Sequence, residues 1–230
     1  MKSKSFFTAR NVAFLSVLLA LVVVLQVFGG YIKIGATSLS FVLVPIVLGS
    51  VMIGPLAGLF LGFVFGLIVF LYGATGADPF TFILFSEHPF LTALICFGKG
   101  MAAGVVPGLL YGVLKKKNRY LGVVVASLSA PIVNTALFIL GALCMSGTLQ
   151  TNFVEEGSTV IYFLIVGCAG INFLVEFGIN LVASPAVYRV TELVKKYRLG
   201  RNAEREEKEQ ETPRAEVREL PKEETHDLSD

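Results

Sequence analysis

The sequence predicts an all-α integral membrane protein, a bundle of six membrane-spanning helices. Hydrophobic residues make up 54% of the 230 residues, charged residues only 16%, and the apolar residues form long runs. A helix needs about 20 mostly apolar residues to cross a bilayer. The six predicted spans are Val12–Phe28, Leu39–Ile53, Pro55–Tyr72, Phe90–Leu114, Leu121–Met145 and Val160–Tyr188.

The first span follows a basic start with Lys2 and Lys4, a pattern that is also typical of a signal peptide. No clear small-residue cleavage site follows, which favours an uncleaved span. The second span is short and meets the third at Gly54-Pro55, which predicts a tight hairpin. The apolar segment Phe80–Phe85 is too short to cross, so we expect a loop at the interface or folded back into the protein.

Charge divides the chain into two parts. The last 33 residues hold 11 of the 17 acidic residues, so we expect a membrane domain over residues 1–197 and a charged, disordered cytoplasmic tail over residues 198–230. Outside the tail, Lys and Arg gather before the first span, between the fourth and fifth, and after the sixth. The positive-inside rule then predicts that both termini are cytoplasmic. The predicted outer loops are Gly29–Ser38, Gly73–Pro89 and Ser146–Ser158.

Polar residues inside the spans are the candidates for a binding site, because burying them in a bilayer is costly. At about 1.5 Å of rise per residue, Lys99, Asn134 and Asn172 lie roughly 13, 16 and 18 Å below the outer helix ends, and Glu176 roughly 24 Å. Side chains from three helices therefore reach a similar depth. This arrangement is typical of a small-molecule site.

Each of these residues also has a structural interpretation. Lys99 could pair with Glu176, although their depths differ by about two turns. Asn134 lies one turn after Pro131 and could satisfy a carbonyl that the proline leaves free. For Asn172, ligand binding and a structural contact are equally favoured. For Glu176, a structural contact is favoured over ligand binding.

Two stripes of small residues are candidates for helix contacts or for docking a partner, since small residues mark contact faces in lipid. The third span carries Gly54, Gly58, Gly62 and Gly66 at every fourth position. The first span carries Ala9, Ala13, Ser16 and Ala20. The stripes could pack on each other, or one could stay open for a separate membrane subunit.

Several classes of protein are disfavoured. The spans contain no histidine, and no phosphate-binding loop of the form G-x-x-x-x-G-K-[ST] occurs. No nucleophile–base set is visible, so we expect neither an enzyme nor a metal or other cofactor. Nucleic acid is not an expected partner. Uphill transport would need an ion gradient or another subunit.

The chain resembles the substrate-binding S-components of energy-coupling factor (ECF) vitamin transporters over about residues 8 to 190. The resemblance rests on the predicted topology, on Ala9-x-x-x-Ala13, and on the order and spacing of several motifs. These motifs are "FVLVPIVLGSVMIGPLAG", "GKGMAAGVVPGLLYGVLKKKN", "APIVNTALFILG" and "NFLVEFGINLVASPA".

The resemblance implies a subunit that binds one micronutrient from outside and docks on a transmembrane coupling protein with two ATPases. It maps the contact with the coupling protein onto Ala9 and Ala13. Ser16 and Ala20 have the same spacing and are an equally good candidate pair for this contact. The subunit is then expected to topple in the membrane and release its cargo inside. The glycine stripe from Gly54 to Gly66 would supply a smooth face for docking and tilting.

The motifs most resemble the pantothenate-type members, and the residues are compatible with that cargo. Pantothenate is an anion with hydroxyls and an amide, for which Lys99 offers charge and Asn134 and Asn172 offer hydrogen bonds. Hydroxymethylpyrimidine, a pyridoxine-like compound and riboflavin are alternative substrates. A self-sufficient secondary transporter and a non-transport membrane scaffold are the alternative classes of protein.

Overall fold

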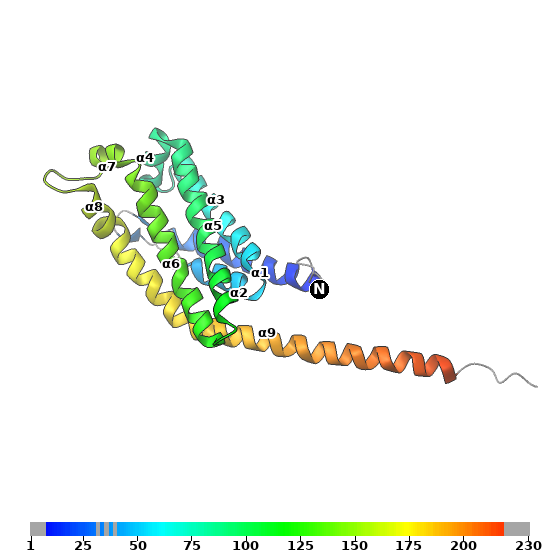
Figure 1. The fold of residues 1–230 in the computed structure, drawn as a ribbon. Coiled ribbons are helices and arrows are strands. Elements are labelled where there is room, and N and C mark those ends of the chain that lie inside the picture. The colour runs from blue at the N-terminus through cyan, green and yellow to red at the C-terminus, as the bar shows by residue number, and fades with distance from the viewer. Residues whose placement is uncertain (1–7, 31–32, 35–36, 39–40, 219–230) are drawn as a thin grey trace, which may run out of the picture. The chain divides into compact units, whose positions relative to one another are not determined.

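The computed structural model describes residues 8–30, 33–34, 37–38 and 41–218. In the described parts of the chain, all long elements are helices (Figure 1). Contacts divide the chain into a compact bundle, Met1–Arg189, and a second unit, Val190–Asp230.

The elements follow one another with short connections. The helices are α1 (Ala9–Gly29), α2 (Leu43–Met52), α3 (Pro55–Thr75), α4 (Pro79–Glu87), α5 (Pro89–Leu114), α6 (Arg119–Leu143), α7 (Ser146–Asn152), α8 (Val160–Tyr162), the π-helix η1 (Phe163–Gly170) and α9 (Ile171–Arg218). The strands β1 (Lys33–Ile34) and β2 (Thr37–Ser38) pair antiparallel, with Lys33 opposite Ser38.

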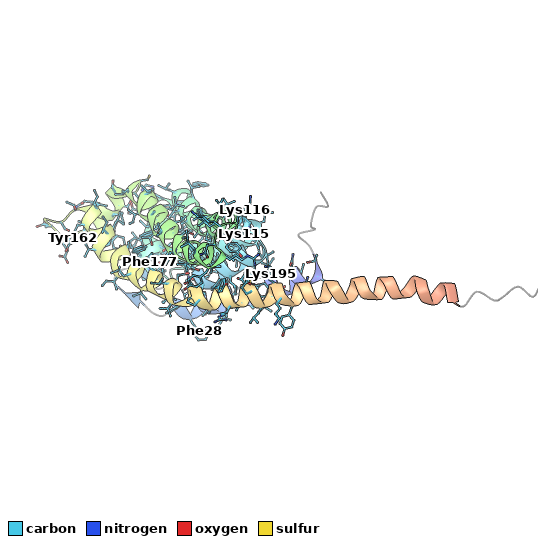
Figure 2. The ribbon with its side chains drawn as sticks, turned by 60° about the horizontal axis from the view of Figure 1, so that its bottom comes forward. Phe28, Lys115, Lys116, Tyr162, Phe177 and Lys195 are labelled. Atoms are coloured by element: carbon cyan, nitrogen blue, oxygen red, sulfur yellow. The ribbon has the colours of Figure 1, made fainter. Side chains whose placement is uncertain are left out.

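Five of the six predicted spans correspond to helices that are long and apolar enough to cross a membrane. These are α1, α3, α5, α6 and the helical stretch Val160–Tyr197, judged by length and composition in the described residues. Their outer surface carries exposed apolar side chains, among them Phe28 (67% exposed) and Tyr162 (60%) (Figure 2).

The second predicted span is different. α2 has only 10 residues, about 15 Å of helix against a hydrocarbon core of about 30 Å. Leu43, Ile46 and Val47 are fully buried, so α2 is a core helix of the bundle. The predicted hairpin is confirmed: Gly54 has φ 140°, which favours glycine, and Pro55 begins α3 immediately after it. The count of six spans and the side of each terminus stay predictions.

Two segments predicted as loops form short helices. The prediction of a loop over Phe80–Phe85 was wrong: α4 covers it, with Asp78 as N-cap and Pro79 in the first turn. Phe80 and Leu84 are buried, because this short helix packs its apolar face on the bundle. The start of the predicted outer loop Ser146–Ser158 is α7.

The sixth predicted span begins as α8, continues through the eight-residue π-helix η1 and becomes α9. α9 continues to Arg218 and so includes the first part of the charged segment, where we expected a disordered tail or, as the alternative, a frayed helix near "NAEREEKEQE". The division between a membrane domain of residues 1–197 and a charged tail stays a prediction.

Two groups of buried apolar residues form the core. The larger one joins α1, α2, α3, α5 and α6 and contains Phe65, Leu61 and Ile46. The smaller one joins α4, α6, α7 and η1 and contains Phe80, Met145 and Leu149.

Glycines hold α3 and α5 in close backbone contact. A Cβ on Gly58 or Gly62 would overlap the carbonyl oxygen of Gly104 or Gly100, respectively, and a Cβ on Gly66 would lie 2.5 Å from the Cys96 carbonyl oxygen. Ser50 of α2 joins the contact by donating to the Gly104 carbonyl at 2.6 Å.

The assignment of the glycine stripe to a docking face is therefore corrected. Gly58, Gly62 and Gly66 pack against α5 within this chain and present no face to a separate subunit. Gly54 has no atom within 4 Å of a Cβ position, and its role is the backbone turn at φ 140°.

We expect Gly62→Ala to lower the stability of the purified protein. The added methyl group meets the Gly100 carbonyl, which the neighbouring helix cannot move cheaply, and overpacking of this kind costs roughly 1–3 kcal/mol. The measurement is the thermal unfolding midpoint in detergent.

Gly112→Ala on α5 is the matched control, because a Cβ there meets no atom within 4 Å. Alanine is a better helix former than glycine by about 1 kcal/mol, so the control should leave the midpoint unchanged or raise it. Equal midpoints for the two variants would contradict a tight α3–α5 contact.

Candidate functional site

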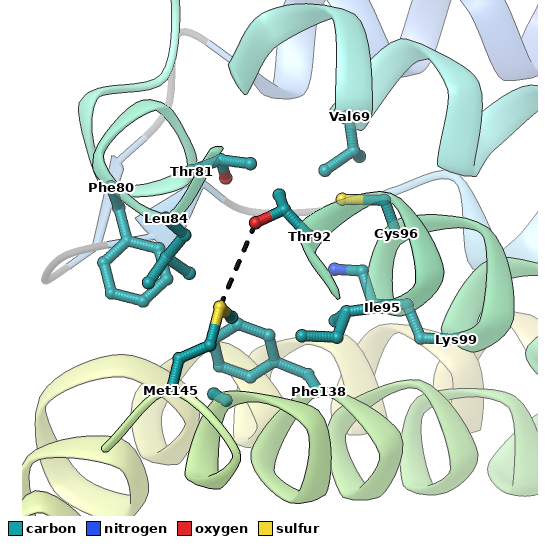
Figure 3. A pocket seen from close by; sticks show the side chains of 11 residues that line it. Val69, Phe80, Thr81, Leu84, Thr92, Ile95, Cys96, Lys99, Phe138 and Met145 are labelled. Atoms are coloured by element: carbon teal, nitrogen blue, oxygen red, sulfur yellow. Dashed lines mark hydrogen bonds between the residues drawn. The ribbon is translucent and has the colours of Figure 1, made fainter. Parts of the chain in front are cut away.

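A pocket lies between α3, α4, α5 and α6, in the part of the bundle where the smaller core group sits (Figure 3). The space between its lining atoms is about 310 Å³, including a part open to solvent. The enclosed part is narrow and has room for about one water molecule. The lining residues are Val69, Phe80, Thr81, Leu84, Thr92, Ile95, Cys96, Lys99, Phe138, Ala142 and Met145.

Lys99 supplies the charge in this pocket. Its side chain is half-buried, and its Nζ lies 5.7 Å from the ring centroid of Phe65 and 5.3 Å from that of Phe138. These cation–π contacts partly replace water around the ammonium group. No carboxylate among the described residues pairs with it. An ammonium group held against aromatic rings without a counter-ion is suited to binding an anion.

Thr92 of α5 and Met145 make a weak polar contact within the same pocket. Thr92 is 2% exposed, and its hydroxyl lies 4.0 Å from the Met145 sulfur (Figure 3). A thioether sulfur is a poor acceptor. The Thr92 hydroxyl is therefore a buried donor with little compensation for its lost hydration.

The short helices α4 and α7 lie at the same end of the bundle (Figure 1). Asp78 holds the start of α4 by accepting hydrogen bonds from the backbone N–H and the hydroxyl of Thr81, at 3.2 and 2.5 Å. The hydroxyl of Thr148 in α7 donates to Glu87 at the end of α4, at 2.9 Å. This bond fixes α7 to the helix that forms one wall of the pocket.

Of the predicted site residues, only Lys99 lines the pocket. Asn134, Asn172 and Glu176 are buried, at 6%, 6% and 5% exposure, but they lie outside the pocket lining. A shared depth does not by itself place side chains in this pocket, because depth along a helix says nothing about the direction of a side chain around it, and a binding role for these three residues stays a prediction.

Asn172 and Asn180 make contacts along their own helix. The Asn172 amide donates to the Cys168 carbonyl at 3.2 Å, where the π-helix gives way to α9. The Asn180 amide donates to the Glu176 carbonyl at 2.9 Å. The suggested Lys99–Glu176 pair is not present in the part of the chain that the structure describes.

Several buried polar groups were not predicted as candidates. Thr92 and Thr81 line the pocket, and only their place in or beside a span could have indicated them. Gln26 of α1 is 4% exposed, with its side-chain oxygen lacking a partner among the described residues. The amide of Gln26 in an otherwise apolar span was a signal that could have been noticed.

The small residues of α1 differ from the glycines of α3. Ala9, Ala13, Ser16 and Ala20 are all exposed. The Ser16 hydroxyl donates to the Val12 carbonyl of its own helix at 3.0 Å, which leaves the stripe smooth and without an exposed donor at that position.

One family of known proteins matches a range that includes all the pocket residues and the α1 stripe from Ala13 onward. The family described as "ECF transporter, substrate-specific component" matches residues 10–188. The chain is also similar to "Pantothenic acid transporter PanT" of Lactococcus lactis subsp. cremoris (strain MG1363). The two are 27% identical over 193 residues, which is 78% of this chain and 92% of the relative.

We expect Thr148→Val to lower the thermal unfolding midpoint in detergent, because it removes the donor of the partly buried contact between Thr148 and the exposed Glu87. A hydrogen bond to a charged group contributes about 1.5–3 kcal/mol. Thr151→Val is the matched control, since the Thr151 hydroxyl is exposed and bonds only to Gly147 of its own helix. Equal midpoints for the two variants would show that this bond does not hold α7 in place.

Proposed function

The chain belongs to the substrate-specific components of ECF transporters, and we propose that it binds pantothenate outside the cell and delivers it to an ECF module. Membership of this family makes it a multi-pass membrane protein and a transporter subunit, not an enzyme. It also implies a substrate and an ECF module as partners in general. The cargo, the mode of docking and the orientation are the proposed parts.

The observation that carries the choice of cargo is the Lys99 ammonium group in an apolar pocket with no carboxylate partner among the described residues. A ligand carboxylate would complete this site with a charge-assisted contact. Pantothenate has a carboxylate, and the name of the similar Lactococcus protein refers to the same compound. The aromatic and aliphatic lining would contact its methyl-bearing part.

A ligand of this size needs more room than the narrow part of the pocket offers. Met145 is an unbranched, flexible side chain within the lining, and such side chains repack at low cost. Phe138 and Leu84 lie near it on neighbouring helices. We expect these side chains to rotate when pantothenate enters.

The stripe of Ala9, Ala13, Ser16 and Ala20 is the proposed face for the coupling protein. It is exposed, whereas the α3 glycines that compete for this role are occupied by α5. Small side chains let a second helix approach closely in lipid. A coupling protein with two ATPases would dock there, and the missing phosphate-binding loop in this chain agrees with energy supplied by that module.

The proposed orientation places both termini in the cytoplasm. Lys115, Lys116, Lys117 and Arg119 are exposed at the connection of α5 and α6 (Figure 2). Acidic residues, Glu87 among them, are found on the helices and loops at the opposite ends of α5 and α6. The excess of basic residues marks the cytoplasmic side.

We expect the purified full-length chain to bind pantothenate, and Lys99→Met to weaken this binding by roughly 10- to 100-fold, because a charge-assisted contact of about 1.5–3 kcal/mol is lost. Isothermal titration calorimetry in detergent measures the affinity. Lys116→Met is the control, since it removes the same charge from an exposed position away from the pocket.

A folded wild-type protein that does not bind pantothenate but binds another vitamin would contradict the assignment of pantothenate as the substrate. It would leave the assignment to the ECF substrate-specific components unchanged. Binding that is equal in wild type and Lys99→Met would overturn the anion site.

We expect Ala13→Leu to reduce co-purification with a co-expressed coupling protein and ATPases by about 10-fold or more, since a tight small-residue contact tolerates no bulk. Pantothenate binding by the isolated chain should not change, because α1 contributes no residue to the pocket lining. Val113→Leu is the control: Val113 is 72% exposed on α5, a helix that carries none of the stripe residues. Equal recovery of the module with both variants would place docking elsewhere.

A further inference from the structure

One face of α5 presents three polar side chains to the pocket: Thr92, Cys96 and Lys99, at positions i, i+4 and i+7 (Figure 3). Thr92 and Lys99 are about 10 Å apart along the helix axis. Long helical side chains lean toward the helix N-terminus, which shortens this separation. The lysine nitrogen and the threonine hydroxyl are both directed into the pocket.

The buried hydroxyl of Thr92 differs from three exposed hydroxyls of the neighbouring helices. Thr75, Ser86 and Thr151 each donate to the carbonyl four residues earlier in their own helix, at 2.7, 2.8 and 3.0 Å. Thr92 does not: among the described residues its hydroxyl has the Met145 sulfur as its partner, and the His88 carbonyl accepts the Thr92 backbone N–H at 2.9 Å.

The cost of this orientation identifies the group that Thr92 is suited to bind. A buried hydroxyl without a good acceptor loses about 1–3 kcal/mol of hydration free energy. A hydrogen bond from the Thr92 hydroxyl to the His88 carbonyl would have avoided most of that loss. The Met145 sulfur at 4.0 Å is a weak substitute. Thr92 is 2% exposed, so bulk water does not compensate it.

We propose that Thr92 is a second donor to the substrate's carboxylate, beside Lys99, and so determines the preference for an acid over a neutral analogue. This rests on the proposed function, in which Lys99 binds the carboxylate of pantothenate. On binding, the Thr92 hydroxyl exchanges the Met145 sulfur for a carboxylate oxygen. The other carboxylate oxygen faces the Lys99 ammonium, and the apolar lining excludes water from both contacts.

The test compares pantothenate with pantothenol, in which a hydroxymethyl group replaces the carboxylate. Calorimetry on the full-length chain in detergent gives both affinities for wild type, Thr92→Val, Thr92→Ser and Lys99→Met. Valine keeps the shape of threonine and removes the donor, so folding should be preserved. Thr75→Val is the control for loss of a helical threonine hydroxyl outside the pocket.

We expect Thr92→Val to weaken pantothenate binding roughly 10-fold and to leave pantothenol binding within about 2-fold of wild type, because only a charged acceptor gains strongly from the hydroxyl. Thr92→Ser should restore the preference. An unchanged pantothenate affinity in Thr92→Val, or an equal loss for both ligands, would overturn this inference while leaving the proposed function intact.

The failure of the proposed function has a different signature. Wild-type protein that binds no pantothenate, or Lys99→Met that binds it as well as wild type, would overturn the anion site and the role of Thr92 with it.

Discussion

The close contact between α3 and α5 is the constraint on which the rest of the bundle depends. In lipid, helices gain little from hydrophobic exclusion and associate through packing, so bare backbone at Gly58, Gly62 and Gly66 is what brings α5 near. Cys96 connects this contact to the pocket, because its carbonyl meets Gly66 while its side chain lines the cavity. One turn further along each helix, Val69 and Thr92 continue into the pocket lining. The glycine contact therefore determines where the pocket begins.

The pocket carries polar groups that the chain itself satisfies poorly. Lys99 is surrounded by the rings of Phe65 and Phe138, and the Thr92 hydroxyl contacts the Met145 sulfur. Each arrangement costs stability in the isolated chain, since a buried charge or donor prefers a strong partner. A ligand carboxylate would give both groups a strong partner, so part of this cost would be relieved on binding. This links the local cost in the bundle to affinity for a substrate.

The two stripes of small residues have different surroundings. The glycines of α3 are buried against α5, while Ala9, Ala13, Ser16 and Ala20 of α1 are exposed. Spacing alone treats them alike, because it reports which residues share a helix face and not which helix lies opposite. The packing leaves α1 as the proposed docking face and makes α3 part of the internal framework.

The sequence by itself determined the helical membrane class, five of the six predicted spans, the Gly54-Pro55 turn and the choice of Lys99 as a candidate that lines the pocket, because these depend on local composition and on the high cost of a charge among apolar residues. Only the tertiary structure decided that α2 is a short core helix and that Phe80–Phe85 folds as α4. It also placed Thr92 beside Lys99 in the lining of a pocket that does not include Asn134 or Asn172. These outcomes depend on the rotation and neighbours of each helix, which residue spacing along one chain does not specify.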